Sequence, residues 1–164
     1  MIILGIDPGT ATTGYGLIKT KRKKGSKRRF ECVGYGLIQT SPSLSTPERL
    51  KKINNDLSRI IKKYQPQILA IESLYFFKNF KTAIPVSQAE GVILLTAAKK
   101  KIPVEFFTPL QVKSIIANNG WAKKDEVQKK IKKILKIKED LRPDDIADAL
   151  AIATCSALRN HKNT

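Results

Sequence analysis

Four carboxylates in this sequence stand where apolar residues would be expected. Asp7 closes the apolar run IILGID, and Glu72 closes the similar run QILAIE. Asp145 and Asp148 lie three residues apart in an alanine-rich segment, a spacing that places both on one face of a helix. Because a buried carboxylate without a partner is costly, each group needs a hydrogen bond, a cation or a metal ion.

The donor types in this set favour metal-dependent chemistry. Carboxylate oxygens without histidine or thiolate favour Mg²⁺ or Mn²⁺, and two such ions held ~3.5–4 Å apart can drive phosphodiester cleavage. The single histidine, His161, lies near the C-terminus, so a mechanism based on Ser–His–Asp or Cys–His is not expected. Each carboxylate alone also has a structural explanation: a turn bond for Asp7, a salt bridge for Glu72, and a favourable helix start for Asp144 and Asp145. The combination is harder to explain without a metal.

The charge balance of the chain points to a polyanionic partner. The 164 residues include 31 Lys and Arg against 14 Asp and Glu, which gives a formal net charge of +17 at pH 7. Such an excess attracts DNA or RNA, although a lysine-rich surface can also serve solubility alone. Cys32 and Cys155 lack the spacing of a metal site and are expected to be small buried side chains. With no apolar run of ~20 residues and no signal peptide, a cytoplasmic location is expected.

Strands and helices that alternate along the chain must position these groups. Apolar runs and turn signals predict strands at residues 2–7, 14–20, 34–40, 67–72 and 103–109. Apolar residues at helical spacing predict helices at residues 45–66, 86–101, 109–120, 123–136 and 142–159. Strands that first form a meander and then alternate with helices indicate an α/β domain with a mixed sheet.

Several helix ends carry recognisable signals. Thr46 is expected to cap the first long helix, with Pro47 at its first helical position. Gly120 is expected to end the helix that begins near Pro109. Pro143 and the acidic residues that follow it suit the N-terminus of the last helix.

Five segments together resemble the RuvC family of Holliday-junction resolvases. They are, in order, ILGIDPGTATTGYGLI, ILAIESLYFFKN, SQAEGVIL, QVKSIIANNGWAKKDEVQ and DDIADALAIA, and they span nearly the whole chain. The resemblance implies an α/β, ribonuclease-H-like fold with a five-stranded mixed sheet flanked by helices. It also implies a homodimer that makes symmetric, Mg²⁺-dependent nicks in four-way junction DNA, with 5′-phosphate and 3′-hydroxyl ends. We expect one nuclease domain over residues 1–160 and a frayed tail at residues 161–164.

The resemblance also implies which side chains act. The four acidic residues of the family correspond to Asp7, Glu72, Asp145 and Asp148, which are expected to be catalytic and to bind the metal. Mg²⁺ is the expected cofactor, with Mn²⁺ as a substitute and two ions in each site. Asp144 is left out, because the family's acidic pair precedes ALAIA at the spacing of the other two aspartates. The family works beside a branch-migration motor, so such a complex is an expected partner.

Four further residues are expected to contact DNA. Tyr75 stands where the family carries a base-stacking aromatic residue, and Lys78 follows it in LYFFKNFK. Lys113 and Lys124 correspond to lysines near the scissile phosphate, where a cation can neutralise charge that develops at phosphorus. Lys123 is the neighbouring alternative to Lys124, and each single lysine could instead be an ordinary solvated charge. The aromatic residues around Tyr75 could equally belong to the core or to a dimer contact.

Two other functions fit parts of the sequence. Another ribonuclease-H-like nuclease or a transposase would share the four acids and differ in its substrate. A non-catalytic nucleic-acid-binding protein would explain the charge but would leave the carboxylates unexplained. A phosphate cradle at GTATTG is disfavoured, because the segment lacks the lysine of a P-loop and does not precede a clear helix.

Overall fold

A single five-stranded mixed sheet organises the molecule. The computed structural model describes residues 1–21, 29–73 and 80–162. The strands lie in the order β3-β2-β1-β4-β5, with β1, β2 and β3 antiparallel and with β1, β4 and β5 parallel. Their bounds are Ile2–Asp7 for β1, Thr12–Lys21 for β2, Arg29–Gln39 for β3, Ile68–Glu72 for β4 and Val104–Phe107 for β5. The expected mixed sheet is confirmed.

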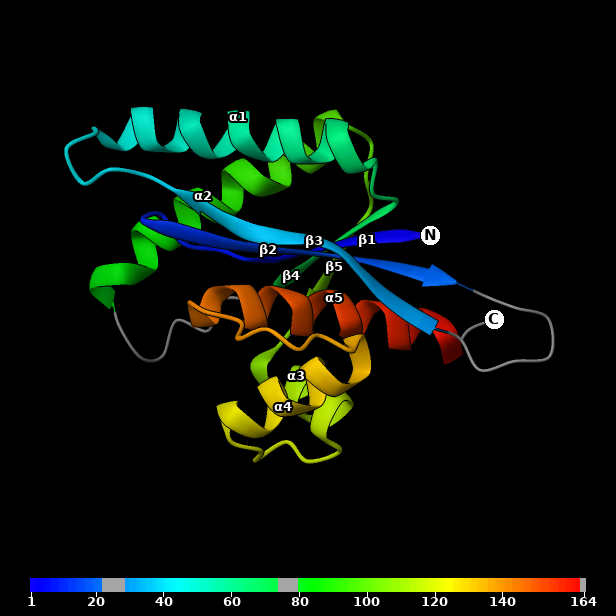
Figure 1. Ribbon diagram of the computed structural model, residues 1–164. Coiled ribbons are helices and arrows are strands. Elements are labelled where there is room, and N and C mark those ends of the chain that lie inside the picture. Colours follow the sequence, from blue (N-terminus) through cyan, green and yellow to red (C-terminus); the bar gives the residue numbers. More distant parts are fainter. Residues whose placement is uncertain (22–28, 74–79, 163–164) are drawn as a thin grey trace.

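Helices cover both faces of the sheet. In Figure 1, α1 and α2 lie above the sheet, α5 lies directly below it, and α3 and α4 lie below α5. Among the described residues, no helix combines the length and the apolar character that crossing a membrane requires. The helices are α1 (Thr46–Tyr64), α2 (Phe80–Lys99), α3 (Pro109–Ala117), α4 (Lys124–Leu135) and α5 (Asp144–Lys162).

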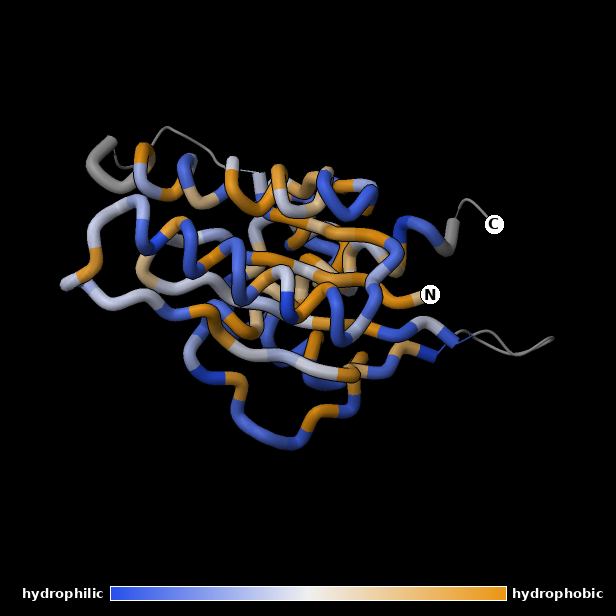
Figure 2. Tube along the Cα trace, turned by 90° about the horizontal axis from the view of Figure 1, so that it is seen from above, coloured by the Kyte–Doolittle hydropathy of each residue, from blue (hydrophilic) through white to orange (hydrophobic). Residues whose placement is uncertain are grey.

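The alternation of side chains along the strands divides the core into two halves. Leu4 and Ile6 of β1 pack with residues of α1 and α2, whereas Ile3 of the same strand packs with residues of α5. Successive residues of a strand point to opposite faces, so the parity of a position decides which helices it meets. Along the helices, Figure 2 shows hydrophilic and hydrophobic residues in turn, as expected for helices with one buried face.

Several element ends differ from the sequence-based predictions. Strand β3 begins at Arg29 instead of residue 34, and helix α2 begins at Phe80 instead of residue 86. Ser45, not Thr46, caps α1, one residue earlier than expected. Its backbone N–H donates to the Glu48 carboxylate at 2.8 Å, and its side chain accepts from the Glu48 backbone N–H, which together form a capping box. Helix α3 ends at Asn118, which adopts the left-handed conformation two residues before Gly120. Helix α5 continues to Lys162, so residues 161 and 162 of the expected tail are helical.

Glycines in β1 and β2 allow α5 to lie directly on the sheet. A Cβ atom at Gly5 would collide with the backbone oxygen of Ala149, and one at Gly14 would collide with the backbone oxygen of Asp145. Alanines on the facing side of α5 complete this close contact, and Ala149 and Ala153 are fully buried. The helix that carries two of the four carboxylates is thus fixed against the strand that carries a third.

Candidate active site

Asp7 and Glu72 end neighbouring parallel strands at the same edge of the sheet. The β1–β4 register pairs Gly5 with Ala70 and Ile6 with Ile71, and the next residue on each strand is the carboxylate. Ala70 belongs to the half of the core that α5 covers. Since residues two positions apart share a face, Asp7 and Glu72 both face α5.

The first turns of α5 bring the two aspartates of the helix to this edge. Gly14 is the ladder partner of Asp7 on β2, and the backbone of Asp145 packs directly against Gly14. Asp148 follows three residues later on the same helix and lines a cavity of about 240 Å³ together with Glu72. The four carboxylates predicted from the sequence therefore gather at one site, from β1, β4 and α5.

The site concentrates negative charge in a partly buried place. Burial, followed by repulsion from Glu72, Asp148 and Asp145, raises the pKa of Asp7 from 3.8 to about 8. Burial and repulsion from Asp148 raise the pKa of Glu72 from 4.5 to about 7. Burial likewise raises the pKa of Asp148, although Lys124 opposes this effect. Such shifts mark carboxylates whose charge is not fully neutralised by the protein.

Lys124 is the cation closest to this acidic group. Its Nζ lies 2.8 Å from the Asp148 carboxylate and 3.2 Å from that of Asp144. Burial lowers the pKa of Lys124, but its hydrogen bonds to the two aspartates outweigh this and raise it overall. Asp144 also accepts a hydrogen bond from Gln128 at 3.2 Å, and these contacts lower its pKa. Asp144 therefore pairs with the lysine at the edge of the site, and this pairing was not predicted from the sequence.

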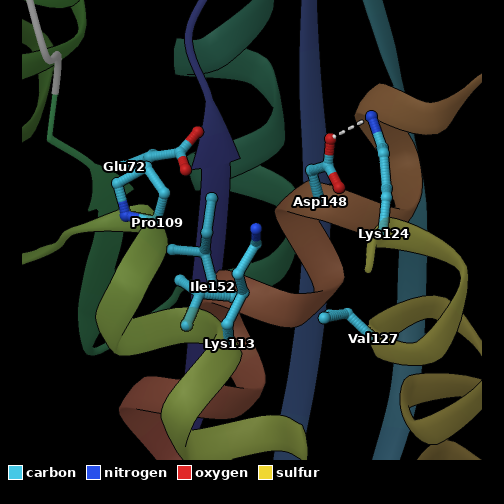
Figure 3. A pocket seen from close by; sticks show the side chains of 8 residues that line it. Glu72, Pro109, Lys113, Lys124, Val127, Asp148 and Ile152 are labelled. Atoms are coloured by element: carbon cyan, nitrogen blue, oxygen red, sulfur yellow. Dashed lines mark ion pairs between the residues drawn. The ribbon is translucent and has the colours of Figure 1, made fainter. Parts of the chain in front are cut away.

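Lys113 enters the same cavity from α3. Figure 3 shows its side chain rising between Glu72 and Asp148, while Lys124 approaches Asp148 from the other side. The apolar wall between them was not identified from the sequence, because its residues resemble ordinary core positions; it consists of Pro109, Val112, Val127 and Ile152. Of the two neighbouring lysines, Lys124 lines the cavity, whereas Lys123 is the N-cap of α4.

The carboxylates do not form a closed cage. Within residues 1–21, 29–73 and 80–162, no three Asp, Glu, His or Cys side chains converge closely enough to hold a metal ion as they stand. In the protein alone the neighbouring carboxylates repel Asp7, and Asp148 is paired with Lys124. Tyr75 and Lys78, also predicted to contact DNA, lie outside the described residues.

The loop GTATTG uses its hydroxyl groups internally. Thr10 Oγ1 donates to the backbone oxygen of Pro85 at 2.6 Å, and Thr13 Oγ1 donates to that of Gly9 at 2.6 Å. The backbone oxygen of Thr10 in turn accepts a hydrogen bond from the Thr40 hydroxyl. These threonines tie the end of β1 to α2 and to the end of β3. Two hydroxyl groups of this loop are therefore engaged within the protein.

The fold and the acidic pocket at the end of its central strands define a nuclease of the ribonuclease-H-like class. The family model described as crossover junction endodeoxyribonuclease RuvC matches residues 3–156. Because this match extends over nearly the whole chain, the chain belongs to the RuvC family of crossover junction endodeoxyribonucleases.

Individual relatives agree with this assignment. The chain is 46% identical to RuvC of Desulforamulus reducens over 157 residues, covering 96% of this chain and 93% of that protein. It is 48% identical to RuvC of Caldicellulosiruptor saccharolyticus over 158 residues, with the same coverage of 96% and 93%. The RuvC structure of Thermus thermophilus superposes with a TM-score of 0.91 at 32% identity, covering 100% of this chain and 98% of that one. The expected ribonuclease-H-like fold is confirmed.

Proposed function

We propose that this chain resolves four-way DNA junctions, with Asp7, Glu72, Asp145 and Asp148 holding a divalent cation at the scissile phosphate. The main observation in support of this proposal is that these carboxylates meet at one edge of the sheet and that the protein does not fully neutralise their charge. The family assignment supports the substrate, as does the similarity to the T. thermophilus RuvC structure in complex with a Holliday junction, with a TM-score of 0.88 at 29% identity. Both favour a junction resolvase over a hybrid nuclease, a transposase or a non-catalytic binding protein.

The donor set fits a hard cation. Every predicted ligand is a carboxylate, and the cavity lining contains no histidine or cysteine, which favours Mg²⁺ with Mn²⁺ as a substitute. The raised pKa values of Asp7 and Glu72 mean that their ionised forms are unfavourable in the protein alone, which supports a site that takes up a positive charge. Two ions in each site is part of the same proposal. Such ions supply Lewis-acid stabilisation of the charge that builds on the phosphate.

The protein's own cations complete the site. Lys113 reaches into the cavity between Glu72 and Asp148, where a scissile phosphate approaching the carboxylates would pass (Figure 3). Lys124 pairs with both Asp148 and Asp144 in the protein alone. Asp144 thus gives Lys124 a second partner when Asp148 serves a different cation. Lys124 would then remain at the edge of the site to meet the phosphate.

A symmetric substrate favours a symmetric enzyme. A four-way junction is two-fold symmetric, so paired nicks in strands of like polarity are made most simply by two copies of one active site. We propose a homodimer that holds the two sites at fixed separation. A branch-migration motor is a further proposed partner, by analogy with the family, and Tyr75 and Lys78 are proposed DNA contacts on the same basis.

The direct test is a cleavage assay on defined DNA. Purified protein is incubated with a mobile four-way junction and with a matched linear duplex, with and without Mg²⁺, and Asp7→Asn is assayed in parallel. Metal-dependent, symmetric nicking of the junction alone, lost in the variant, is the expected result. An RNA–DNA hybrid in the same assay separates a hybrid nuclease from a junction resolvase. Tight junction binding without cleavage in Mg²⁺ or Mn²⁺ would contradict the proposal.

A further inference from the structure

Trp121 is a large aromatic side chain that the fold leaves in solvent. It is 88% exposed, the largest exposed fraction among the large hydrophobic side chains of the described residues. It is also the single tryptophan of the sequence. An indole ring has a large apolar surface and is normally buried in a core or an interface. Because this ring is exposed, it adds nothing to the stability of the monomer through burial.

The backbone around Trp121 is held in a defined turn. Its N–H donates to the side-chain oxygen of Asn119 at 3.0 Å, and the N–H of Ala122 donates to the backbone oxygen of Asn119 at 3.1 Å. Asn118 ends α3 in the left-handed conformation, and Ala122 is buried in the core. The two residues that flank the turn are therefore fixed, and Trp121 projects from it.

This turn joins the two helices that supply the lysines of the candidate active site. Lys113 lies on α3, before the turn, and Lys124 begins α4, directly after it; both line the cavity with Glu72 and Asp148. The backbone at Gly120 packs against Leu110 and Ser114 of α3. Trp121 therefore lies in the turn between the two helices that carry these lysines, three residues before Lys124, which contacts Asp148.

From this placement we infer that Trp121 stacks on a nucleobase of the junction strand next to the scissile phosphate. This inference deepens the proposed function and rests on it. The neighbouring lysines, including the exposed Lys123, favour binding of a polyanion beside this turn. An aromatic ring beside a basic groove is the arrangement that binds unstacked bases. Figure 1 places the α3–α4 turn on the side of the sheet opposite α2, which argues against a contact with a second copy through α2.

The single tryptophan makes a direct test possible, because all indole emission comes from this site. The protein is titrated with a four-way junction in EDTA, so that no cleavage occurs, and junction binding is followed independently by the anisotropy of a fluorescein label. We expect the tryptophan emission to be quenched in parallel with the rise in anisotropy. Junction binding that leaves the emission unchanged would overturn the inference and leave the proposed function intact. Failure to bind or cut junctions at all would overturn both.

Variants separate stacking from simple apolar contact. We expect Trp121→Leu to weaken junction binding roughly tenfold and Trp121→Phe to retain most of it, since only an aromatic ring offers a stacking face. The thermal midpoint should be the same for all three proteins, because the side chain is exposed. Equal junction affinity of the Leu variant and the parent protein would overturn the inference. So would dissociation of a dimer by Trp121→Leu in sedimentation, which would identify a contact between copies instead.

Discussion

At the scale of single residues, the ionised form of the buried Asp7 carboxylate lowers the stability of the protein. Burial and three neighbouring carboxylates raise its pKa to about 8, whereas the side chain in an unfolded chain titrates near 3.8. The folded state therefore binds the proton more tightly than the unfolded state between these two values. The stability of the metal-free protein should accordingly fall as the pH rises through this window.

Replacing Asp7 by asparagine should relieve this cost. We expect Asp7→Asn to raise the free energy of unfolding by roughly 2 kcal/mol at pH 8 without divalent cations, while abolishing cleavage. Urea unfolding at pH 5 and pH 8 measures the effect, which should be larger at pH 8. Asp56→Asn is the matched control, because Asp56 pairs with Lys52 and Arg59 on α1 and should lose a little stability when neutralised. A destabilised Asp7→Asn protein would show that the carboxylate is structural.

Asp144 and Asp148 of α5 should differ sharply in how much they contribute to junction cleavage. Asp144 is exposed and paired with Lys124 and Gln128, whereas Asp148 faces Glu72 across the cavity. We expect Asp144→Asn to keep junction cleavage within about threefold of the parent protein, since only a surface ion pair is lost. Asp148→Asn should lose about 100-fold or more. Single-turnover cleavage rates in Mg²⁺ measure both, and an equal loss in the two variants would place Asp144 among the metal ligands.

At the scale of elements, the position of α5 depends on glycines that could be mistaken for a nucleotide-binding signal. Gly5 and Gly14 remove side chains where the helix backbone meets β1 and β2. As a consequence, a methyl group at either position would collide with the backbone of α5. Because Asp145 and Asp148 are carried by α5, a small displacement of the helix changes their distances to Asp7 and Glu72 on the sheet.

A methyl group at Gly5 should therefore affect folding and cleavage together. We expect Gly5→Ala to lower the free energy of unfolding by about 2 kcal/mol, because the new Cβ meets the backbone of Ala149 and Ala153. Chemical denaturation measures this change, and cleavage by the folded fraction should also fall. Lys19→Ala, at an exposed position of β2, is the control and should change stability by less than about 0.5 kcal/mol. Equal stabilities for the two variants would contradict the close-contact explanation.

The existence and order of the elements could be predicted from the sequence because their apolar periodicity is strong, but the starts of β3 and α2 were placed five and six residues too late. That four carboxylates gather could be predicted from two acids at strand ends and two at helical spacing, whereas their catalytic role stays a prediction. The role of Lys124 beside Asp144 could not, because it depends on how α4 meets α5. Trp121 was missed because an isolated aromatic residue in a turn carries no periodic signal; its exposure is a property of the folded chain alone.

At the scale of the whole molecule, one face of α2 is exposed, with none of the described residues packed on it. Ile84, Gly91 and Leu95 follow one another at intervals of seven and four residues, which places them on one side of the helix. Ile84 is 68% exposed, Leu95 is 53% exposed, and the space around Gly91 is open. A small residue between two large apolar ones lets a second helix approach closely. This face is therefore our choice for the contact in the proposed homodimer.

A charge on this face should separate the two copies and uncouple the two cuts. We expect Leu95→Glu to shift sedimentation from dimer to monomer, because an ionised carboxylate cannot be buried between two apolar helices without a partner. On a supercoiled plasmid with an extruded cruciform, the parent protein should give linear product and the variant nicked circles. In sedimentation, Leu110→Glu is the control and should stay dimeric: Leu110 is similarly exposed but lies on α3, on the opposite side of the sheet. A Leu95→Glu protein that stays dimeric would move the interface elsewhere, and one that becomes monomeric yet still linearises the plasmid would show that paired cutting does not need the dimer.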